Sequence, residues 1–241
     1  NWVLFLYFNK HMIIKHVFFD LDRTIWDFEK NSIVTLTEIF NDFKLSEIGV
    51  NSVDLFIDKY KYHNNKLWNL YRDNKITKEY LRDSRFYLTL NEFNIEDSIL
   101  GKLMGKTYIE KSPLKTGLFP YTIEVLDYLF KKYKLHIITN GFVEVQHIKL
   151  KSSSLDKFFE NIITSEQVGV KKPNKKIFKY ALKKANALEN QSIMIGDDYL
   201  ADIVGAQNAG IKSIYFNPSK NKSNKIGVTE IKSLLDLKEL L

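Results

Sequence analysis

The sequence predicts an α/β protein: a Rossmann-like, doubly wound parallel sheet core with an inserted bundle of helices that forms a cap. Two patterns lead to this prediction. Short runs of β-branched or aromatic residues, each stopped by Asp, Asn, Gly or Ser, alternate with amphipathic helical patterns at both ends of the chain. Between about Phe28 and Ile109 the strand signal lapses and only helical periodicity remains. The chain has 241 residues, of which 44% are hydrophobic, enough for one domain that carries an insertion.

The strands of the predicted core are brief apolar runs, as expected for a parallel sheet that is covered on both faces. They span residues 13–19, 135–139, 161–164, 192–195 and 212–216. Helical patterns lie between them at 121–133 and 174–187, and the second opens just after Pro173, a favourable residue for a first helical turn. This alternation predicts βαβ crossovers.

The inserted segment predicts four antiparallel helices, at 31–43, 53–71, 77–90 and 95–108. We therefore expect a core domain of residues 12–27 and 110–241 and a helical cap domain of residues 28–109. Because an open α/β sheet binds ligands beyond the carboxyl ends of its strands, a bundle inserted there is expected to act as a lid. Four aromatic residues at helical spacing are interpreted as core of the cap: Trp68, Tyr71, Phe86 and Tyr87. Arg82 and Arg85 are candidates for contacting substrate, although solvated helix faces are more typical of such residues.

Composition and the chain ends exclude several classes of protein. The chain has no Cys, which rules out disulfides and a thiolate nucleophile, and its five His show no metal-ligand spacing. The net charge of +7 comes from scattered Lys and is weak support for a nucleic-acid surface. Residues 2–8 are apolar but too short to span a bilayer, and they lack the features of an export signal. Met12 is a plausible natural start, so residues 1–11 are interpreted as an upstream remnant, with a short extra strand as the alternative.

Polar residues follow the ends of the predicted strands. Asp20 and Asp22 come after the first strand, and on an extended chain two such carboxylates point to the same side, so both are expected to face one pocket. Because like charges so close together repel each other, a cation is expected between them. The other stretches are Thr139-Asn140-Gly141, Lys171-Lys172-Pro173, and Gly196-Asp197-Asp198 followed by Asp202. Each stretch alone is more often a turn or a helix cap.

Together and in this order, DLDRT, ITNGF, KKP and GDDYLAD resemble the four signature motifs of the haloacid dehalogenase-like (HAD) hydrolase superfamily. The resemblance runs from about Met12 to the C-terminus, and the insertion stands where that superfamily has its type I cap. More narrowly, four stretches are similar to the pyrimidine 5'-nucleotidase branch, cytosolic enzymes that remove phosphate from nucleoside monophosphates. They are DLDRTIWDFEKNS, LWNLYRDNKITKEYLRDSRF, ITNGFVEVQ and SEQVGVKKPNKKIF. The resemblance implies a Mg²⁺-dependent phosphatase that acts through an aspartyl phosphate.

The resemblance also implies roles for the residues of the motifs. Asp20 would attack phosphorus, and Asp22 would protonate the leaving oxygen and then accept a proton from the hydrolytic water. Mg²⁺ would be bound by Asp20, by the backbone carbonyl of Asp22 and by Asp197. Thr139 and the backbone of Asn140 and Gly141 would hold the phosphate oxygens.

Lys172 would pair with Asp20 and with the transferring phosphate as a point charge. Asp202 would orient a metal-bound water or Lys172 from behind the metal, with Asp198 and Thr24 in the same outer layer. Asp198 stands where many relatives have Ser, which leaves open whether Asp197, Asp198 or Asp202 touches the metal; we favour Asp197.

Other functions remain as alternatives. Phosphoglycolate or sugar-phosphate hydrolysis is the second reading, because selectivity depends on the cap. Haloacid dehalogenation is disfavoured because those members lack the second acid, present here as Asp22. A phosphorylated receiver domain or a non-catalytic binding module are remote alternatives. The expected partner is a small phosphorylated metabolite, with no nucleic-acid polymer and no membrane, and the expected state is a monomer or a weak homodimer.

Overall fold

The computed structural model describes residues 14–219 and 227–241, so the predictions for residues 1–11 and Met12 lie outside the described residues. The chain divides into two compact units. One consists of the residues up to Asp27 together with Gly117–Leu241, and the other is Phe28–Thr116. The predicted end of the insertion at residue 109 falls inside helix α5 (Ser98–Lys111), so the second unit extends further along the chain than the sequence pattern indicated.

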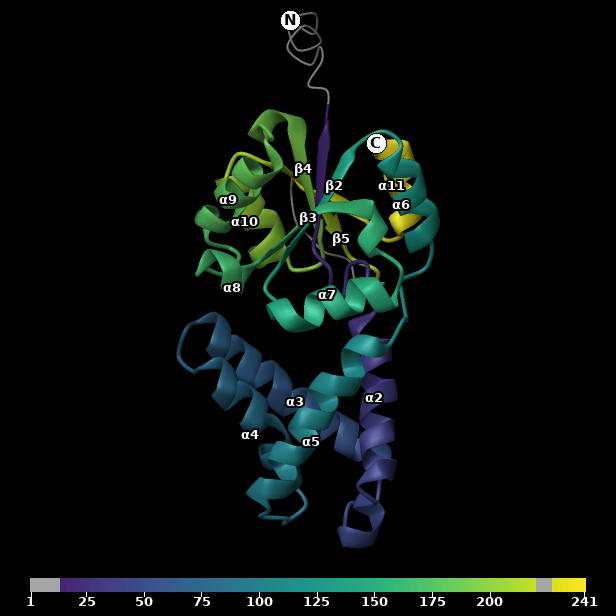
Figure 1. The fold of residues 1–241 in the computed structure, drawn as a ribbon, viewed down its shortest axis with the longest axis vertical. Helices are drawn as coiled ribbons and strands as arrows, with labels where there is room; N and C mark the ends of the chain where they lie inside the picture. The colour runs from purple at the N-terminus through teal and green to yellow at the C-terminus, as the bar shows by residue number, and fades with distance from the viewer. Residues whose placement is uncertain (1–13, 220–226) are drawn as a thin grey trace, which may run out of the picture. The chain divides into compact units, whose positions relative to one another are not determined.

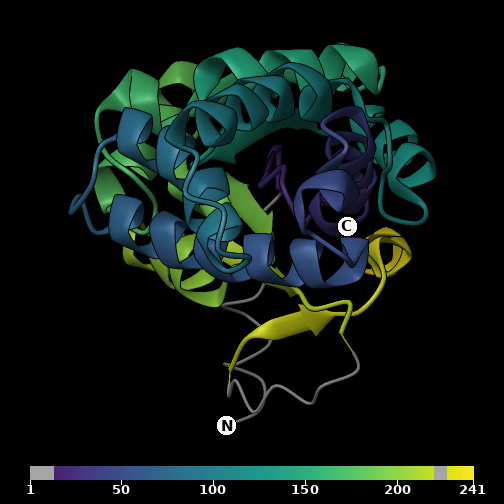
Figure 2. The ribbon, with the colours of Figure 1, turned by 90° about the horizontal axis from the view of Figure 1, so that it is seen from below.

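The first unit is built on a six-stranded parallel sheet with the strand order β3-β2-β1-β4-β5-β6. The strands are β1 (His16–Phe19), β2 (Lys134–Thr139), β3 (Phe159–Thr164), β4 (Ser192–Gly196), β5 (Lys212–Phe216) and β6 (Thr229–Ile231). The predicted α/β class with its parallel sheet is confirmed, and each of the five predicted strands is present. Strand β6, at the outer edge of the sheet in yellow in Figure 2, was not predicted because its three residues carry no apolar run.

Helices cover both faces of this sheet (Figure 1). Helices α9 (Lys175–Ala185) and α10 (Gly205–Asn208) lie on one face, and α6 (Thr122–Phe130) and α11 (Leu237–Leu240) lie on the other. Apolar side chains from four neighbouring strands and from α9 form a core that includes Phe18, Ile138, Ile163, Ile177, Phe178 and Met194. Burial on both sides explains why the strands read as continuous apolar runs.

Shorter elements connect these layers. They are α7 (Val143–Ser152), α8 (Ser165–Val168), a π-helical turn at Tyr199–Val204, and 3-10 turns at Asp156–Phe158, Glu189–Gln191 and Leu234–Asp236. Helix α9 begins later than predicted: the Asn174 side chain accepts a hydrogen bond from the Lys176 amide at 3.0 Å and caps the helix, so Pro173 precedes the cap and is not in the first turn.

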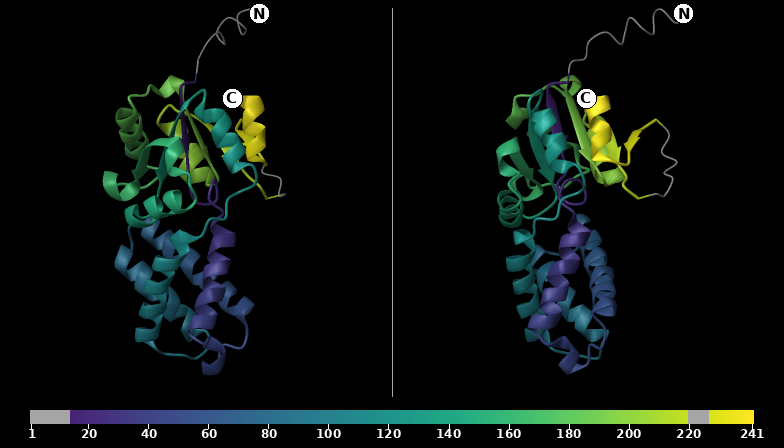
Figure 3. Two further views of the ribbon diagram at one scale, coloured as in Figure 1. Left: turned by 45° about the vertical axis from the view of Figure 1, so that its right-hand side comes forward. Right: turned by 90° about the vertical axis from the view of Figure 1, so that its right-hand side faces the viewer.

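The second unit contains four main helices, α2 (Phe28–Asp42), α3 (Val53–Arg72), α4 (Lys78–Asn91) and α5, with 3-10 turns at Leu45–Ile48 and Ser112–Leu114. Helix α3 packs against α4, α4 against α5, and α2 against both α3 and α5, and the four lie together in both views of Figure 3. Ser52, Thr77 and Asp97 cap three of them through their side-chain oxygens. The shared apolar core includes Leu36, Ile39, Phe56, Tyr60, Phe86, Leu90, Met104 and Tyr108.

Arg85 is buried inside this unit, so its assignment to a solvated helix face was wrong. Its side chain is 5% exposed, and its guanidinium lies 4.6 Å from the ring centre of Tyr108 and 5.9 Å from that of Tyr60. Leu81, Arg85 and Thr89 recur every four residues and share one buried face of α4. Of the aromatics predicted to be core, Tyr71 and Phe86 are buried, and Trp68 and Tyr87 are half-buried. In the described part of the chain, no helix combines the length and hydropathy that crossing a bilayer requires.

Candidate active site

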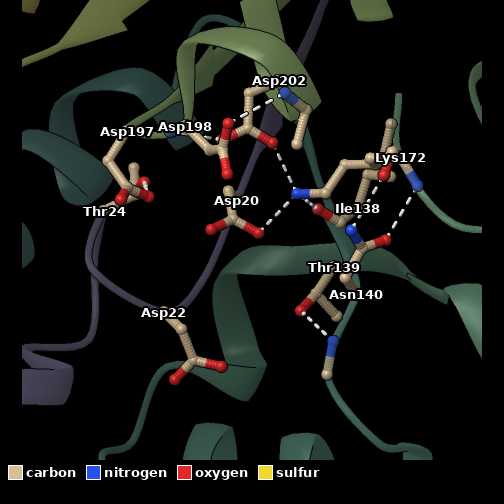
Figure 4. Close-up of polar contacts among 12 residues, drawn as sticks. Asp20, Asp22, Thr24, Ile138, Thr139, Asn140, Lys172, Asp197, Asp198 and Asp202 are labelled. Carbon is tan, nitrogen blue, oxygen red and sulfur yellow. Dashed lines mark hydrogen bonds and ion pairs between the residues drawn. The ribbon is translucent and has the colours of Figure 1, made fainter. Parts of the chain in front are cut away.

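The motif residues gather at the carboxyl edge of the sheet (Figure 4). Asp20 follows β1, Thr139 ends β2 with Asn140 after it, and Asp197 follows β4. The register pairs Phe19 with both Ile137 and Ile195, so the carboxyl ends of these three strands lie within two residues of one another. Lys172 comes from the loop between α8 and α9, and Asp202 from the π-helical turn after β4. Residues from distant parts of the sequence therefore meet where open α/β sheets bind ligands.

Lys172 is the centre of the site. Its ammonium nitrogen lies 2.6 Å from Asp20 Oδ1 and 2.6 Å from Asp202 Oδ1, and it donates to the Ile138 carbonyl at 2.8 Å. Burial alone would lower the pKa of this lysine, which is 3% exposed, but the charges of the two carboxylates outweigh burial and raise the pKa above its ordinary value. Lys172 is therefore a fixed positive charge against Asp20.

Asn140 holds the backbone of Lys172 in place. The Asn140 Oδ1 accepts from the Lys172 amide at 2.8 Å, and its Nδ2 donates to the Lys172 carbonyl at 3.1 Å. The Asn140 side chain thus positions the lysine, which leaves its backbone for the predicted phosphate contact. The Gly141 amide, predicted to hold phosphate, donates to Thr139 Oγ1 at 3.0 Å. The phosphate-binding roles of Thr139, Asn140 and Gly141 stay predictions.

Three carboxylates crowd around this lysine. Asp20, Asp197 and Asp202 each offer an oxygen, and the three oxygens lie within 4.8 Å of one another. Burial raises the pKa of Asp20, and the charges of Asp202 and Asp197 raise it further against the pull of Lys172. Burial and the Asp202 charge also raise the pKa of Asp197 to about 7, although Arg23 and a hydrogen bond from Thr24 Oγ1 at 3.1 Å oppose the shift.

The raised pKa values show that these acids are difficult to ionise together, because the cluster is buried and carries more negative than positive charge. A cation placed among them would relieve that repulsion. The three clustered atoms are carboxylate oxygens, which suit a hard dication such as Mg²⁺. The residues present therefore fit the predicted metal.

Gly196 makes room for Asp202. A β-carbon built on Gly196 would lie 2.3 Å from Asp202 Oδ2 and 2.4 Å from its carboxyl carbon, closer than real atoms approach. The same Oδ2 accepts a hydrogen bond from the Asp198 amide at 3.0 Å. Asp202 is 1% exposed, so it has no space to retreat. The glycine of the fourth motif is thus explained by the close approach of the last aspartate.

Asp198 has a different task from its neighbours. Its Oδ1 accepts from the amides of Leu200 and Ala201, both at 3.0 Å, and so caps the π-helical turn. Of the three acids left open by the sequence, Asp197 and Asp202 join the cluster with Asp20, and the Asp198 carboxylate is used as a cap. Thr24, which is fully buried, joins the first motif to the fourth through Asp197.

The Asp22 carboxylate is not one of the three that form the acid cluster, and it lies apart from them in Figure 4. That Asp20 and Asp22 face one pocket stays a prediction. Strand β1 ends at Phe19, and a turn follows in which the Leu21 carbonyl accepts hydrogen bonds from the amides of Ile25 and Trp26. Asp22 is bonded instead to Gln146 and Lys149 of α7. Neither Gln146 nor Lys149 was predicted as a site residue, although their spacing of three places them on one face of a helix.

Comparisons with known proteins give the family. A family model described as haloacid dehalogenase-like hydrolase matches residues 17–216. The chain is 32% identical over 229 residues to the pyrimidine 5'-nucleotidase YjjG of Escherichia coli, covering 93% of this chain and 96% of that protein. It is 30% identical over 238 residues to a glyceraldehyde 3-phosphate phosphatase of Methanothermobacter thermautotrophicus, covering 95% and 100%.

A solved structure agrees over nearly the whole chain. It is that of the HAD-hydrolase YfnB from Bacillus subtilis bound to magnesium, a crystal form that reveals interdomain movement in that protein. The two structures share 28% identity with a TM-score of 0.85, and the match covers 95% of this chain and 99% of that one. With the four motifs gathered at one edge of a parallel sheet and a family model spanning most of its length, this chain belongs to the haloacid dehalogenase-like hydrolases.

Proposed function

We propose that this protein is a Mg²⁺-dependent phosphatase of small phosphate monoesters, and that its substrates are pyrimidine nucleoside 5'-monophosphates. The observation that carries the proposal is the buried contact of 2.6 Å between Lys172 and Asp20, set beside the Asp197 and Asp202 carboxylates. A nucleophilic carboxylate, a fixed cation and an oxygen-rich metal cluster are the parts that phosphoryl transfer requires.

In the proposed mechanism, an oxygen of Asp20 attacks phosphorus and the ester P–O bond breaks, which leaves an aspartyl phosphate on Asp20. Asp22 gives a proton to the departing oxygen. In the second half, Asp22 accepts a proton from water as the water attacks the phosphorus. The bond between phosphorus and the Asp20 oxygen breaks, the Asp20 carboxylate is restored, and inorganic phosphate leaves. Lys172, together with Thr139 and the backbone of Asn140 and Gly141, would hold the phosphate oxygens.

Asp20 and Asp197, with the backbone carbonyl of Asp22, would hold the magnesium ion. When bound, Mg²⁺ supplies positive charge that offsets the carboxylates and the negative oxygens of the phosphate. Asp202 would keep Lys172 in position through their contact of 2.6 Å. We expect the enzyme to work in the cytosol as a monomer or a weak homodimer on free metabolites.

The nucleotidase YjjG, similar over almost the full length of both chains, supports the nucleotide as substrate. A second candidate is a small sugar phosphate, since the glyceraldehyde 3-phosphate phosphatase matches at 30% identity over an equally long stretch. A screen of phosphate release separates the two. A higher kcat/KM for pyrimidine nucleotides than for glyceraldehyde 3-phosphate, sugar phosphates and phosphoglycolate supports the first candidate, and the reverse order overturns it.

The nucleophile is tested with Asp20→Asn. This variant should abolish Mg²⁺-dependent release of phosphate from p-nitrophenyl phosphate and leave the circular dichroism spectrum unchanged. Asp127→Asn, a change at an exposed position of α6, is the matched control and should keep wild-type turnover. Wild-type turnover in Asp20→Asn would show that another group attacks the phosphorus.

A further inference from the structure

Both carboxylate oxygens of Asp22 accept hydrogen bonds from side chains of α7. Lys149 donates to Asp22 Oδ1 at 2.5 Å, and the Gln146 amide nitrogen donates to Asp22 Oδ2 at 3.1 Å. Both partners are buried, Gln146 at 1% and Lys149 at 5% exposure. A buried ammonium or amide N–H group is costly unless it is hydrogen-bonded, and Asp22 accepts from the Lys149 ammonium and from the Gln146 amide nitrogen.

The backbone next to the phosphate motif is shaped to admit Gln146. A β-carbon built on Gly141 would lie 1.6 Å from Gln146 Nε2 and 2.6 Å from its Cδ. Any residue other than glycine at position 141 would therefore push the amide away from Asp22. Gln146 and Lys149 lie about one turn apart on α7, which begins at Val143, so the segment that follows β2 carries the two donors to Asp22 together.

Trp26 fixes the other side of Lys149. The ammonium nitrogen lies 4.3 Å from the centre of the Trp26 ring, within reach of a cation–π interaction, and this tryptophan is fully buried. Trp26 closes the turn that carries Asp22, since its amide donates to the Leu21 carbonyl at 2.9 Å. Lys149 thus contacts both the acid and the turn that holds it, and its charge cannot move away from Asp22 without losing both contacts.

We propose that Lys149 and Gln146 are positioning residues that promote proton transfer from Asp22 to the leaving group. The inference rests on the proposed phosphatase function. As the Asp22 O–H bond breaks and the proton joins the departing oxygen, the carboxylate of Asp22 gains negative charge. The Lys149 ammonium and the Gln146 amide already point at the oxygens on which that charge develops, so they stabilise the transition state without rearranging.

This role depends on how much the leaving group needs a proton. A nucleoside 5'-monophosphate releases an alkoxide, which is a poor leaving group unless it is protonated. p-Nitrophenyl phosphate releases a phenolate that is stable as an anion, so its departure depends little on Asp22. Loss of Lys149 should therefore slow the first substrate far more than the second. A purely structural role would slow both substrates alike.

The experiment compares kcat/KM for uridine 5'-monophosphate and p-nitrophenyl phosphate, because this constant reports the steps up to release of the leaving group. Lys149→Met keeps the length of the side chain and removes its charge. It should lower kcat/KM for the nucleotide about 100-fold, in the range of general-acid contributions, and less than about 10-fold for the aryl ester. Lys149→Arg, which keeps the charge, should recover most of the nucleotide activity, and Gln146→Met should show the same selectivity with a smaller loss.

Lys151→Met removes an exposed lysine from the same helix and should leave both constants unchanged. Equal losses for the two substrates in Lys149→Met, or no loss, would overturn the inference while the phosphatase function stands. Wild-type protein that releases no phosphate from either ester would overturn the function itself. If Lys149→Met does not fold, Lys149→Arg and Gln146→Met test the proposal instead. The same quantity is compared, the loss of kcat/KM for uridine 5'-monophosphate relative to the loss for p-nitrophenyl phosphate.

Discussion

Two histidines are buried side by side in the sheet, and the contribution of one of them, His136, to the stability of the fold should fall in mild acid. His136 on β2 is fully buried, with Nε2 3.1 Å from His16 Nδ1 on β1 and Nδ1 3.0 Å from the Asn161 amide nitrogen on β3. Since that amide can only donate, His136 Nδ1 must accept, and the neutral ring donates through Nε2 to His16. A second proton on His136 would face a donor, with the charges of His16 and Lys134 nearby.

The size of the effect follows from the pKa of His136. Burial, and then the charges of His16 and Lys134, lower this pKa from 6.5 to about 3. Between these values the unfolded chain binds a proton that the folded chain does not. The contribution of His136 to the free energy of unfolding therefore falls as the pH falls from 6.5 toward 3. At pH 5 the expected loss relative to pH 7.5 is about 2 kcal/mol, since each pH unit is worth about 1.36 kcal/mol once the unfolded histidine is protonated.

The test is urea unfolding of the wild type and His136→Gln at both pH values, followed by circular dichroism. Glutamine does not titrate, so the variant should lack the acid-induced loss of about 2 kcal/mol, and taking the difference between the two proteins cancels the contribution of the buried carboxylates. Asn161→Asp offers a carboxylate to a protonated His136 and should also reduce the loss. If the wild type and His136→Gln lose equal free energy between pH 7.5 and 5, the assignment of a neutral buried His136 is wrong.

Asp197→Asn removes one charge from the acid cluster, so it should raise the melting temperature of the metal-free protein and abolish the further rise on adding Mg²⁺, both measured by thermal unfolding. Gly196→Ala places a methyl carbon 2.3 Å from Asp202 Oδ2 and should lower phosphate release more than about 100-fold, measured as kcat. Arg85→Ala empties a buried position beside Tyr108 and should cost about 2–4 kcal/mol in urea unfolding.

The main elements of the fold were predictable because local and global signals agree there. Buried parallel strands are brief apolar runs, and the residues that follow β1, β2 and β4 are polar where the strands end. Strand β6 was not predicted because it is a short Thr-Glu-Ile segment at the edge of the sheet, where a strand can carry polar residues. Arg85 was misplaced because its charge suggested water, whereas stacking on aromatic rings stabilises it inside.

The cluster of Asp20, Lys172 and Asp197 was expected from the motifs, but the surroundings of Asp22 were not. The direction of the Asp22 side chain depends on a turn that begins within two residues of the end of β1. Hydrophobic periodicity in the sequence does not predict the backbone path of so short a turn. Gln146 and Lys149, which contact Asp22, lie more than 120 positions away from it in the sequence. Such pairings become visible only once the register of β1 against β2 is known.

Strand β1 stands in the middle of the sheet, with β2 along one edge and β4 along the other. During synthesis β1 is made first, whereas β4 begins only at Ser192. At usual rates of synthesis, β4 therefore becomes available to pair with β1 on the order of ten seconds or more after β1 is made. Throughout that interval one row of backbone groups on β1 has no native partner and can pair with another chain. Nascent or truncated forms that stop before residue 192 are thus the ones that call for chaperone protection.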